Sequence, residues 1–444
     1  MSVSPARKLA FETLLKVEQD LGFAPDLLRA SAQSTLKDAD RRLATEIVMG
    51  TLRWRGELDF QIEQRLARRG SELDPEIRTA LRMTFYQFEF LDKIPAWAAV
   101  HDAVELVKMA GKRSAAGLVN AVLRKSPPPK LKLTAADALP AALRSYPAWL
   151  LARWERHYGR AAAEALAWAA AQSPPTVLRV LGGELEVSAL EKKLASQGVR
   201  TRRSQLAPGA RRVESGDHAG LQNSPQFGMV IQDEASQLVP LLLAARPGQR
   251  VLDLAAAPGI KTVQIAEAMG QGWLVAADRS GRRLRAMRRL WPQLAPPNVP
   301  LHAVRLDASR PLPFAYQFDR VLADVPCSGT GTLARNPEIK WRLQESDFSR
   351  LARTQAAILR QGLESLAPGG RLVYSTCSLE PEENEAVVEA VLSEAQNFRR
   401  LARAEFATEF PFLSSLFDAA GYFRTRPDLH GTDGFFAAVI LREC

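Results

Sequence analysis

The chain has 444 residues, of which 46% are hydrophobic and 24% charged, and a net charge of +10. These values fit a globular protein of about three domains, and three cysteines at wide spacing exclude a disulfide framework and a cysteine-based metal site. No apolar run is long enough to span a membrane, and the N-terminus has no signal-peptide pattern. We therefore expect a cytoplasmic protein without metal and without membrane contact.

The positive charge is concentrated in the front half of the chain. Lysine plus arginine outnumber aspartate plus glutamate by 21 to 17 in residues 1–130 and by 13 to 8 in residues 131–231, but only by 25 to 24 in residues 232–444. This distribution is what a polyanion-binding module joined to an enzyme would have. A solvated, arginine-rich surface is the alternative, and charge alone does not decide between them.

Residues 1–125 have helical periodicity throughout. Leu43, Ile47 and Val48 recur at the spacing of one helix face, for example, and Asp40 is a plausible N-cap. The run Ser126 to Lys130 contains three prolines and cannot continue a helix. We therefore expect an all-α first domain over residues 1–130.

A second unit is predicted over residues 141–231. It begins with a helical stretch at 147–170, followed by a strand at 176–180, a helix at 187–196 and a strand at 228–231. Strands and helices in this proportion predict a small α+β middle domain.

From residue 232 onward, strand and helix patterns alternate. The predicted strands are 250–254, 273–277, 301–306, 319–324, 370–375 and 435–441, and the predicted helices are 261–269, 280–290, 346–366 and 381–395. Such alternation is typical of a doubly wound parallel sheet. We expect a C-terminal α/β Rossmann-like domain over residues 232–444.

The loop after the first of these strands is a candidate cofactor site. Its residues are Ala255, Ala256, Ala257, Pro258, Gly259, Ile260, Lys261 and Thr262. With a single glycine it is neither a dinucleotide fingerprint nor a P-loop. Its small side chains nevertheless let a ligand approach the backbone, and the following helix offers free N–H groups.

Acidic residues end four strands of this domain in order: Asp253, Asp278, Asp307 and Asp324. One such residue alone is more often a helix cap or part of a solvated turn, but four in order favour a ligand site. We expect Asp278 to accept hydrogen bonds from ribose hydroxyls and Asp307 to hold an exocyclic amine. A nucleoside carrying an amino-acid carboxylate is S-adenosylmethionine, which we predict as the cofactor.

Two of the three cysteines directly follow apolar runs. Cys327 stands in Asp-Val-Pro-Cys-Ser-Gly after residues 320–323, and Cys377 stands in Ser-Thr-Cys-Ser after residues 371–374. Ligands of open α/β sheets lie at the carboxyl ends of the strands. A lone cysteine is more often a small buried hydrophobe, but a pair at these positions indicates covalent attack on a carbon centre.

These motifs resemble those of the Sun family of RNA cytosine-5 methyltransferases. The resemblance rests on residues 253–262, 324–329 and 375–378, on Pro337 to Trp341 and on Asp433 to Phe436. The helical front, with Asp40-Arg41-Arg42, Leu52 to Gly56 and Gly117 to Arg124, resembles the NusB-like domain of the bacterial RsmB-type branch. Two positions depart from the pattern: Ala255 stands where many members have Cys, and Ile260 where many have Gly, so a reshaped methionine pocket is expected.

The resemblance implies methylation of cytosine C5 in 16S small-subunit ribosomal RNA, with the RNA free or in early subunit assembly and the enzyme a monomer. It implies that Cys377 is the nucleophile and that Cys327 assists breakdown of the adduct. Asp324 would bind the base and lie beside the cofactor, and Lys261 would lie near both. A helix beginning at Pro381 would favour the Cys377 thiolate, although Glu380, Glu382 and Glu383 oppose that effect.

Several alternatives stay open at the level of sequence. Lys340, Trp341 and Arg342 would either clamp RNA or form an exposed helix start. The RNA could be a tRNA or another RNA. A DNA cytosine-5 methyltransferase would attack with the Pro-Cys cysteine and carry a Glu-Asn-Val motif, which is absent. A non-catalytic RNA-binding or antitermination factor is less consistent with the complete set of strand-end residues.

Overall fold

The computed structural model describes residues 3–31, 36–67, 70, 72–125, 134–182, 184–216 and 228–444. The chain divides into two compact units, the first formed by residues 1–174 and 332–342, and the second by residues 175–331 and 343–444. The domain boundaries predicted from the sequence remain a prediction.

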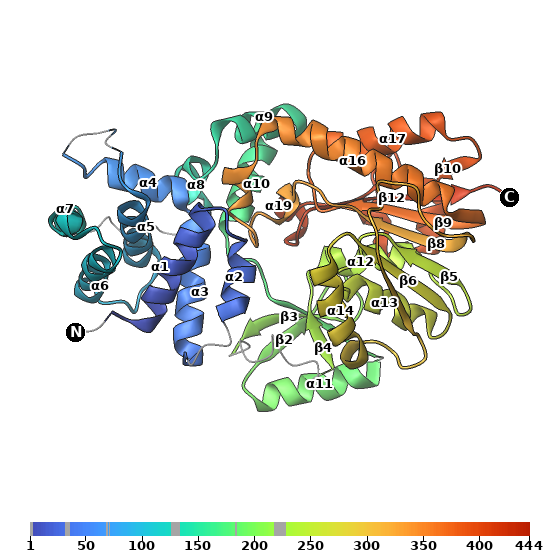
Figure 1. Ribbon diagram of the computed structural model, residues 1–444, viewed down its shortest axis with the longest axis horizontal. Coiled ribbons are helices and arrows are strands. Elements are labelled where there is room, and N and C mark those ends of the chain that lie inside the picture. The colour runs from blue at the N-terminus through green and yellow to red at the C-terminus, as the bar shows by residue number, and fades with distance from the viewer. Residues whose placement is uncertain are drawn as a thin grey trace. The chain divides into compact units, whose positions relative to one another are not determined.

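The first unit is helical (Figure 1). Its helices are α1 (Pro5–Glu18), α2 (Ala24–Ser31), α3 (Asp38–Arg53), α4 (Arg55–Glu63), α5 (Pro75–Phe90), α6 (Ala96–Met109), α7 (Ala116–Arg124), α8 (Ala135–Arg144), α9 (Ala148–Tyr158), α10 (Arg160–Ala171) and the short α15 (Ile339–Arg342). Proline stands at the first position of α1 and α5, where its missing N–H has no intrahelical partner to lose. The apolar faces enclose one core, which includes Ile47, Leu58 and Phe85.

The second unit contains a small antiparallel sheet in the order β2-β3-β1-β4. Its elements are β1 (Val177–Val180), α11 (Glu184–Ser196), β2 (Arg200–Arg203), β3 (Ala210–Ser215) and β4 (Met229–Ile231). Leu178 and Leu194 pack between this sheet and α11. The small α+β part predicted from the sequence is thus present, with β2 and β3 in addition to the two predicted strands.

The large sheet has the order β10-β12-β9-β8-β5-β6-β7, with β11 paired to β12. Its strands are β5 (Arg250–Asp253), β6 (Trp273–Asp278), β7 (Leu301–Arg305), β8 (Phe318–Asp324), β9 (Leu366–Thr376), β10 (Phe398–Arg400), β11 (Phe423–Thr425) and β12 (Phe435–Arg442). The strands from β9 to β7 run parallel, and β12 is antiparallel to β9. The predicted α/β fold of the C-terminal part is confirmed.

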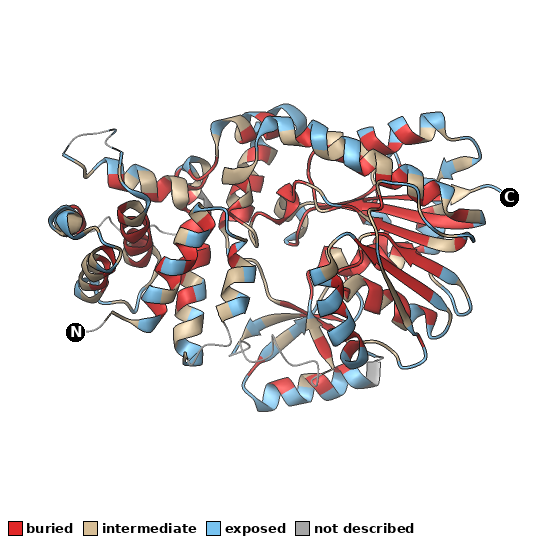
Figure 2. Ribbon diagram, in the orientation of Figure 1, coloured by how far each residue is buried: buried red, intermediate tan, exposed pale blue. Residues whose placement is uncertain are grey.

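Helices cover both faces of this sheet (Figure 1). They are α12 (Glu234–Leu242), α13 (Ile260–Met269) and α14 (Gly281–Leu294) on one face, and α16 (Glu345–Glu364) and α17 (Glu385–Glu394) on the other. The helices α18 (Arg403–Glu409) and α19 (Pro427–His430) follow near the end of the chain. The parallel strands β5, β6, β8 and β9 are mostly buried between these layers, as the colouring in Figure 2 shows, whereas the edge strand β7 is only partly buried.

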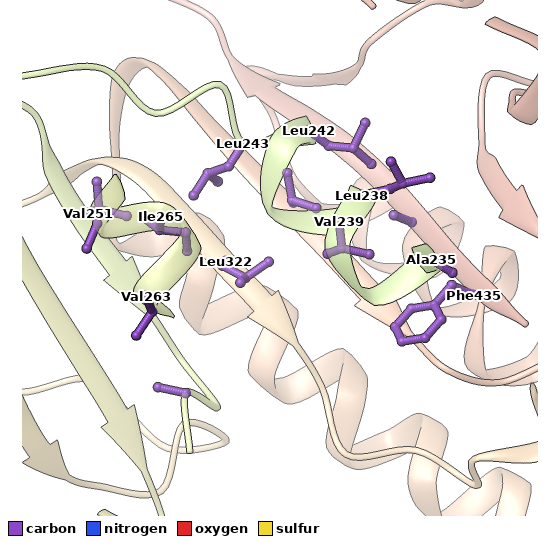
Figure 3. Close-up of a cluster of buried hydrophobic side chains, with 14 of the residues drawn as sticks. Ala235, Leu238, Val239, Leu242, Leu243, Val251, Val263, Ile265, Leu322 and Phe435 are labelled. Carbon is purple, nitrogen blue, oxygen red and sulfur yellow. The ribbon is translucent and has the colours of Figure 1, made fainter. Parts of the chain in front are cut away.

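Apolar contacts hold α12 and α13 against the sheet. Leu238 and Leu242 of α12, Ile265 of α13 and Leu322 of β8 belong to one buried cluster (Figure 3). Asp233 caps α12 by accepting a 2.9 Å hydrogen bond from the backbone N–H of Ala235. This packing fixes the carboxyl ends of the parallel strands, where the predicted site residues lie.

Candidate active site

The two cysteines of the sequence motifs lie side by side. Their sulfur atoms are 3.3 Å apart, and both thiols are free and partly buried. The parallel pairing of β8 with β9 places Asp324 opposite Ser375, so the loops that follow both strands begin at the same edge of the sheet. The structure therefore brings together the two cysteines that the sequence placed at strand ends.

The thiols have different electrostatic surroundings. The hydrogen bond with Cys377 and burial raise the pKa of the Cys327 thiol well above its usual value. The nearby carboxylate of Glu383 acts in the same direction. Cys327 is therefore held in its protonated form, which is a poorer nucleophile than a thiolate.

A lysine–aspartate pair lies beside the cysteines. The Nζ of Lys261 is 2.5 Å from a carboxylate oxygen of Asp324, whose other oxygen accepts a 2.8 Å hydrogen bond from Ser375. Burial alone would lower the pKa of Lys261, but the negative charge of Asp324, with those of Cys377 and Asp253, raises it above its usual value. Lys261 therefore stays charged beside Asp324 and Cys377.

The prediction that a helix beginning at Pro381 favours the Cys377 thiolate is wrong. Residues Pro381–Glu383 form a single 3-10 turn, and α17 begins only at Glu385, because Asn384 has a non-helical backbone conformation (φ −108°, ψ −109°). A turn of three residues lacks the aligned peptide dipoles of an α-helix. The cation that lies near Cys377 is instead Lys261.

The predicted cofactor loop joins β5 to α13. Gly259 precedes α13 with a φ of +104°, and a methyl group on it would lie 2.8 Å from Cγ of Met287. Only glycine fits this position without strain. Ala256 and Ala257 are buried, Ala255 and Ile260 are partly buried and Pro258 is exposed. Small side chains thus leave the loop backbone open to close approach, as binding of a nucleoside-linked amino acid requires.

Two of the strand-end carboxylates have local backbone partners. Asp278 accepts hydrogen bonds from the backbone N–H groups of Ala257 (3.2 Å) and Ser280 (2.7 Å), which ties it to the cofactor loop. Asp307 accepts from Ser309, and those hydrogen bonds lower the pKa of Asp307. Asp278 is therefore bonded to the loop between β5 and α13, and within the described residues neither Asp278 nor Asp307 is bonded to the cysteine pair.

Asp253 is completely buried at the end of β5. One of its oxygens accepts a 2.8 Å hydrogen bond from the hydroxyl of Thr262, and the other has no partner among the described residues. Burial raises the pKa of Asp253 to about 7. This carboxyl group is positioned to fix the start of α13 and, through it, Lys261.

Glu383 is a site residue that sequence reasoning assigned only an unfavourable charge. Its carboxylate accepts hydrogen bonds from the backbone N–H of Ser328 (2.9 Å), from Gln355 (2.8 Å) and from the hydroxyls of Ser328 and Ser378. Ser328 and Ser378 directly follow the two cysteines. One buried carboxylate thus connects both cysteine loops, and the only signal in the sequence was the cluster of acidic residues at 380–385.

Asn384 and two glycines complete the support of the Cys377 loop. Asn384 accepts from Thr376 and donates to the carbonyl of Ser378, so it binds the chain on both sides of Cys377. A methyl group on Gly331 would lie 2.1 Å from the carbonyl oxygen of Gly434 and 2.9 Å from that of Cys377. The Asp433 to Phe436 motif therefore reaches the site through the backbone of Gly434.

The prediction that Lys340, Trp341 and Arg342 clamp RNA or form an exposed helix start is wrong for Lys340. Lys340 is only 1% exposed, donates a 2.8 Å hydrogen bond to the carbonyl of Arg53 and lies over the ring of Tyr146. Arg342 donates to the carbonyls of Val17 and Gly22. This segment follows the Cys327 loop in sequence but is part of the core of the helical unit.

Within the described ranges, no group of three or more His, Cys, Asp or Glu side chains could hold a metal ion. The same part of the chain contains no helix that is both long and apolar enough to cross a membrane.

Comparison with known proteins shows which family has this arrangement. Residues 240–441 match the model described as 16S rRNA methyltransferase RsmB/F, residues 4–127 match the NusB family and residues 146–217 match the RsmF/B-like ferredoxin-like domain. A Bacillus subtilis protein named "Probable ribosomal RNA small subunit methyltransferase B" is 33% identical over 453 residues, covering 100% of both chains. The chain belongs to the RsmB/F methyltransferase family. The resemblance noted in the sequence is thereby confirmed.

Other RsmB/F relatives and a solved structure agree. The ribosomal RNA small subunit methyltransferase B of Xanthomonas campestris is 32% identical over 441 residues, covering 98% of this chain and 97% of that protein. The crystal structure of PH0851 superimposes with a TM-score of 0.79 at 24% identity over 99% of each chain, which supports the fold. The order of a NusB domain, a ferredoxin-like part and an RsmB/F methyltransferase domain is that predicted from the sequence.

Proposed function

We propose that this chain methylates C5 of a cytosine in 16S ribosomal RNA, with S-adenosylmethionine as methyl donor, through a covalent bond between Cys377 and C6 of the base. The observation that carries the proposal is the pair of thiols 3.3 Å apart at the ends of β8 and β9, next to the Lys261–Asp324 pair. Two thiols and a carboxylate at this edge provide a nucleophile, a proton carrier and a partner for the base.

The reaction begins with activation of the base. Cytosine C5 is a poor nucleophile, so the Cys377 thiolate adds to C6 and the resulting enamine makes C5 nucleophilic. Asp324 holds the base at N3 and N4, and the charged Lys261, which lies beside Asp324, faces the negative charge that develops during the addition. S-adenosylmethionine, when bound, supplies an electrophilic methyl group for C5.

Product release requires loss of the C5 proton and of the C6–S bond. A base removes the proton from C5, the C5–C6 double bond re-forms, and the Cys377 thiolate leaves. The protonated state of Cys327 supports its assignment to this second half of the reaction, because a thiol within hydrogen-bond distance can donate a hydrogen bond to the departing Cys377 thiolate.

The cofactor would be held by residues 255–261 and by the carboxylates at the ends of β6, β7 and β8. Gly259 has a left-handed backbone conformation, and small side chains precede it. Together they leave room for the carboxylate of the cofactor close to the start of α13. Asp278 would accept hydrogen bonds from the ribose and Asp307 from the exocyclic amine, while Asp324 borders the methyl group. We also propose that the enzyme acts as a monomer in the cytoplasm, on free RNA or an early assembling subunit.

Bisulfite mapping of 16S ribosomal RNA tests the proposal. RNA from cells with the gene should contain one cytosine protected from conversion that is unprotected in cells without it, and the purified full-length protein should restore protection in vitro. A chain carrying Cys377→Ala is the matched control and should not restore it. Protection that appears on tRNA instead, or methylation at a position other than C5, would contradict the proposal.

A further inference from the structure

An uninterrupted run of positive charge lies between the two predicted cofactor carboxylates. Residues 279–306 contain seven arginines and no acidic residue: Arg279, Arg282, Arg283, Arg285, Arg288, Arg289 and Arg305. Residues 232–444 hold 25 basic and 24 acidic residues, so without these seven the remainder holds 18 against 24. The near-neutral total of this part of the chain therefore hides a strongly basic segment.

Most of these arginines lie on α14. The helix buries Leu284, Met287, Trp291 and Leu294 against the sheet, and its five arginines are exposed (Figure 2). At 100° per residue, Arg282, Arg285 and Arg289 lie at the centre of the exposed face, with Arg283 and Arg288 at its edges. The helix thus presents a face whose charged groups all have the same sign.

Among the described residues, four of the five arginines of α14 are not neutralised by a carboxylate. The exception is Arg283, which lies 3.6 Å from a carboxylate oxygen of Asp278. Among the described residues Arg282 and Arg285 form no ion pair, and Arg288 and Arg289 donate only to the backbone carbonyls of Ala303 and Arg285. On α16 of the same unit, by contrast, Arg350 pairs with Asp347 and Arg360 with Glu394, each at 2.7 Å. Arg350 and Arg360 are thus neutralised by carboxylates, whereas among the described residues Arg282, Arg285 and Arg289 are not.

Two guanidinium side chains converge at the start of α14. A methyl group on Gly281 would lie 3.4 Å from Cδ of Arg305 and 3.7 Å from Nη1 of Arg285. Like charges this close repel each other unless an anion lies between or above them. The guanidinium group is also the side chain that best matches the oxygen pairs of a phosphate.

The inner side of the same helix is fastened to the cofactor loop. Met287 packs against Gly259, and Arg283 donates a hydrogen bond to the carbonyl of Ala257. A ligand on the outer face of α14 would be separated from the cofactor loop by about one helix diameter, ~10 Å. An RNA strand whose target base enters the active site must have phosphates at such distances.

We propose that the arginine face of α14, formed by Arg282, Arg285 and Arg289, binds the phosphate backbone of the RNA substrate together with Arg305. This inference rests on the proposed function for the identity of the RNA. It adds a second RNA surface, within the methyltransferase part, to the basic segments before residue 232. Arg283 is left out because it contacts the cofactor loop.

The test compares two full-length triple variants with equal loss of charge. The first carries Arg282→Gln, Arg285→Gln and Arg289→Gln, and the matched control carries Arg350→Gln, Arg353→Gln and Arg360→Gln, all exposed on α16. Binding of transcribed 16S ribosomal RNA is measured from low salt to about 0.3 M, and binding of S-adenosylmethionine is measured by calorimetry.

The α14 variant should bind the RNA at least about tenfold more weakly near 0.15 M salt. Its plot of log K against log salt should be shallower by about 2, since each lost phosphate contact removes roughly 0.7–0.9 of slope. The α16 variant should keep the wild-type slope, and both variants should keep the wild-type affinity for S-adenosylmethionine.

Two results would overturn the inference. RNA affinity and slope unchanged in the α14 variant would leave an acidic protein as the partner of this face, and equal losses in both variants would mean that only net charge matters. Failure of the proposed function has a different signature. In that case the wild type binds RNA and the α14 variant binds it weakly, but no cytosine is methylated by either protein.

Discussion

The carboxylate of Glu383 lies 2.9 Å from the backbone nitrogen of Ser328, in a site where it is completely buried. The same carboxylate accepts from the hydroxyl of Ser378 at 2.5 Å. Each serine directly follows one of the two cysteines. The relative position of the thiols is therefore set by one side chain that belongs to neither cysteine motif.

We predict that Glu383→Gln lowers kcat by at least about tenfold while the KM for RNA stays within about threefold. Glutamine keeps the size but replaces an acceptor oxygen with an N–H₂ group that cannot accept from the serines, a loss of about 1.5–3 kcal/mol per charge-assisted bond. Methyl transfer under steady-state conditions measures both constants.

A general folding defect would also lower kcat, so a matched variant is needed. Glu385→Gln removes a carboxylate two residues away that pairs with Arg424 and does not contact the cysteine loops. It should retain nearly wild-type turnover. The pH dependence of Cys327 alkylation should also move to lower pH in Glu383→Gln, because the Glu383 charge contributes to the raised pKa of that thiol. Unchanged turnover and alkylation would disprove this role of Glu383.

Substitution of each cysteine should impair a different step of the reaction. Cys377→Ala should abolish methyl transfer and form no covalent complex. Cys327→Ala should form the adduct and accept the methyl group but release the product slowly. Denaturing electrophoresis should therefore show a protein–RNA species for Cys327→Ala that is absent from the double variant. Activity retained by Cys377→Ala would reverse the assigned roles.

Asp278→Ala should weaken S-adenosylmethionine binding by at least about tenfold. The change removes two expected bonds to the ribose, and also the acceptor that holds the backbone of Ala257 and Ser280. Calorimetry with the full-length protein measures the affinity. Asp319→Ala, which removes an acceptor at the opposite end of the sheet, is the control and should bind normally.

Gly331→Ala should displace the Cys377 loop without affecting the cofactor. The added methyl group would lie 2.1 Å from the carbonyl oxygen of Gly434, a distance that no packing tolerates. We expect methyl transfer to fall at least about tenfold while S-adenosylmethionine affinity is kept. Gly117→Ala, where a methyl group meets open space within a helix, should leave activity unchanged.

The helical unit should lose stability as the pH rises from about 4.5 to about 8. Both carboxylate oxygens of Glu89 are buried and have no partner among the described residues, and burial raises the pKa of Glu89 to about 8. The folded state therefore holds a proton that the unfolded state has released in this window, so the free energy of unfolding falls with pH.

Glu89→Gln should reduce the loss of stability that the helical unit shows as the pH rises. We compare the free energy of unfolding of the variant with that of the wild type at pH 5 and at pH 8.5. The variant's advantage should be larger at pH 8.5, by on the order of 2 kcal/mol. Urea denaturation at the two pH values measures this. Glu12→Gln, on the exposed side of α1, should show no such dependence.

The sequence was most informative where one local rule decided the structure. Strand 319–324 was predicted from its apolar run and is observed as β8 (Phe318–Asp324), and the loop before α13 was predicted from its small residues before Lys261. Arg200–Arg203, now β2, could not be found in this way because its exposed arginines show no apolar alternation. Its pairing with β3 is a tertiary effect.

The sequence analysis misplaced Lys340 and missed the role of Glu383 for the same physical reason. Burial of Lys340 depends on Arg53 and Tyr146, which are far away in sequence, and no local pattern indicates it. Glu383 was assessed by its charge, whereas its role follows from two loops that meet only in the folded chain. The arginines of α14 were visible in the sequence, but a charge count over more than two hundred residues cancelled them.

The placement of residues 332–342 has a consequence for dissecting this protein. The segment leaves the methyltransferase part directly after the Cys327 loop, buries Lys340 in the helical core and returns at residue 343. A protein fragment beginning at residue 232 would lack the helical core that buries Lys340. It would therefore expose Lys340, which follows the Cys327 loop in sequence. No single cut in the linker separates the two parts cleanly. Unfolding of the helical core would therefore also release the segment that directly follows the Cys327 loop.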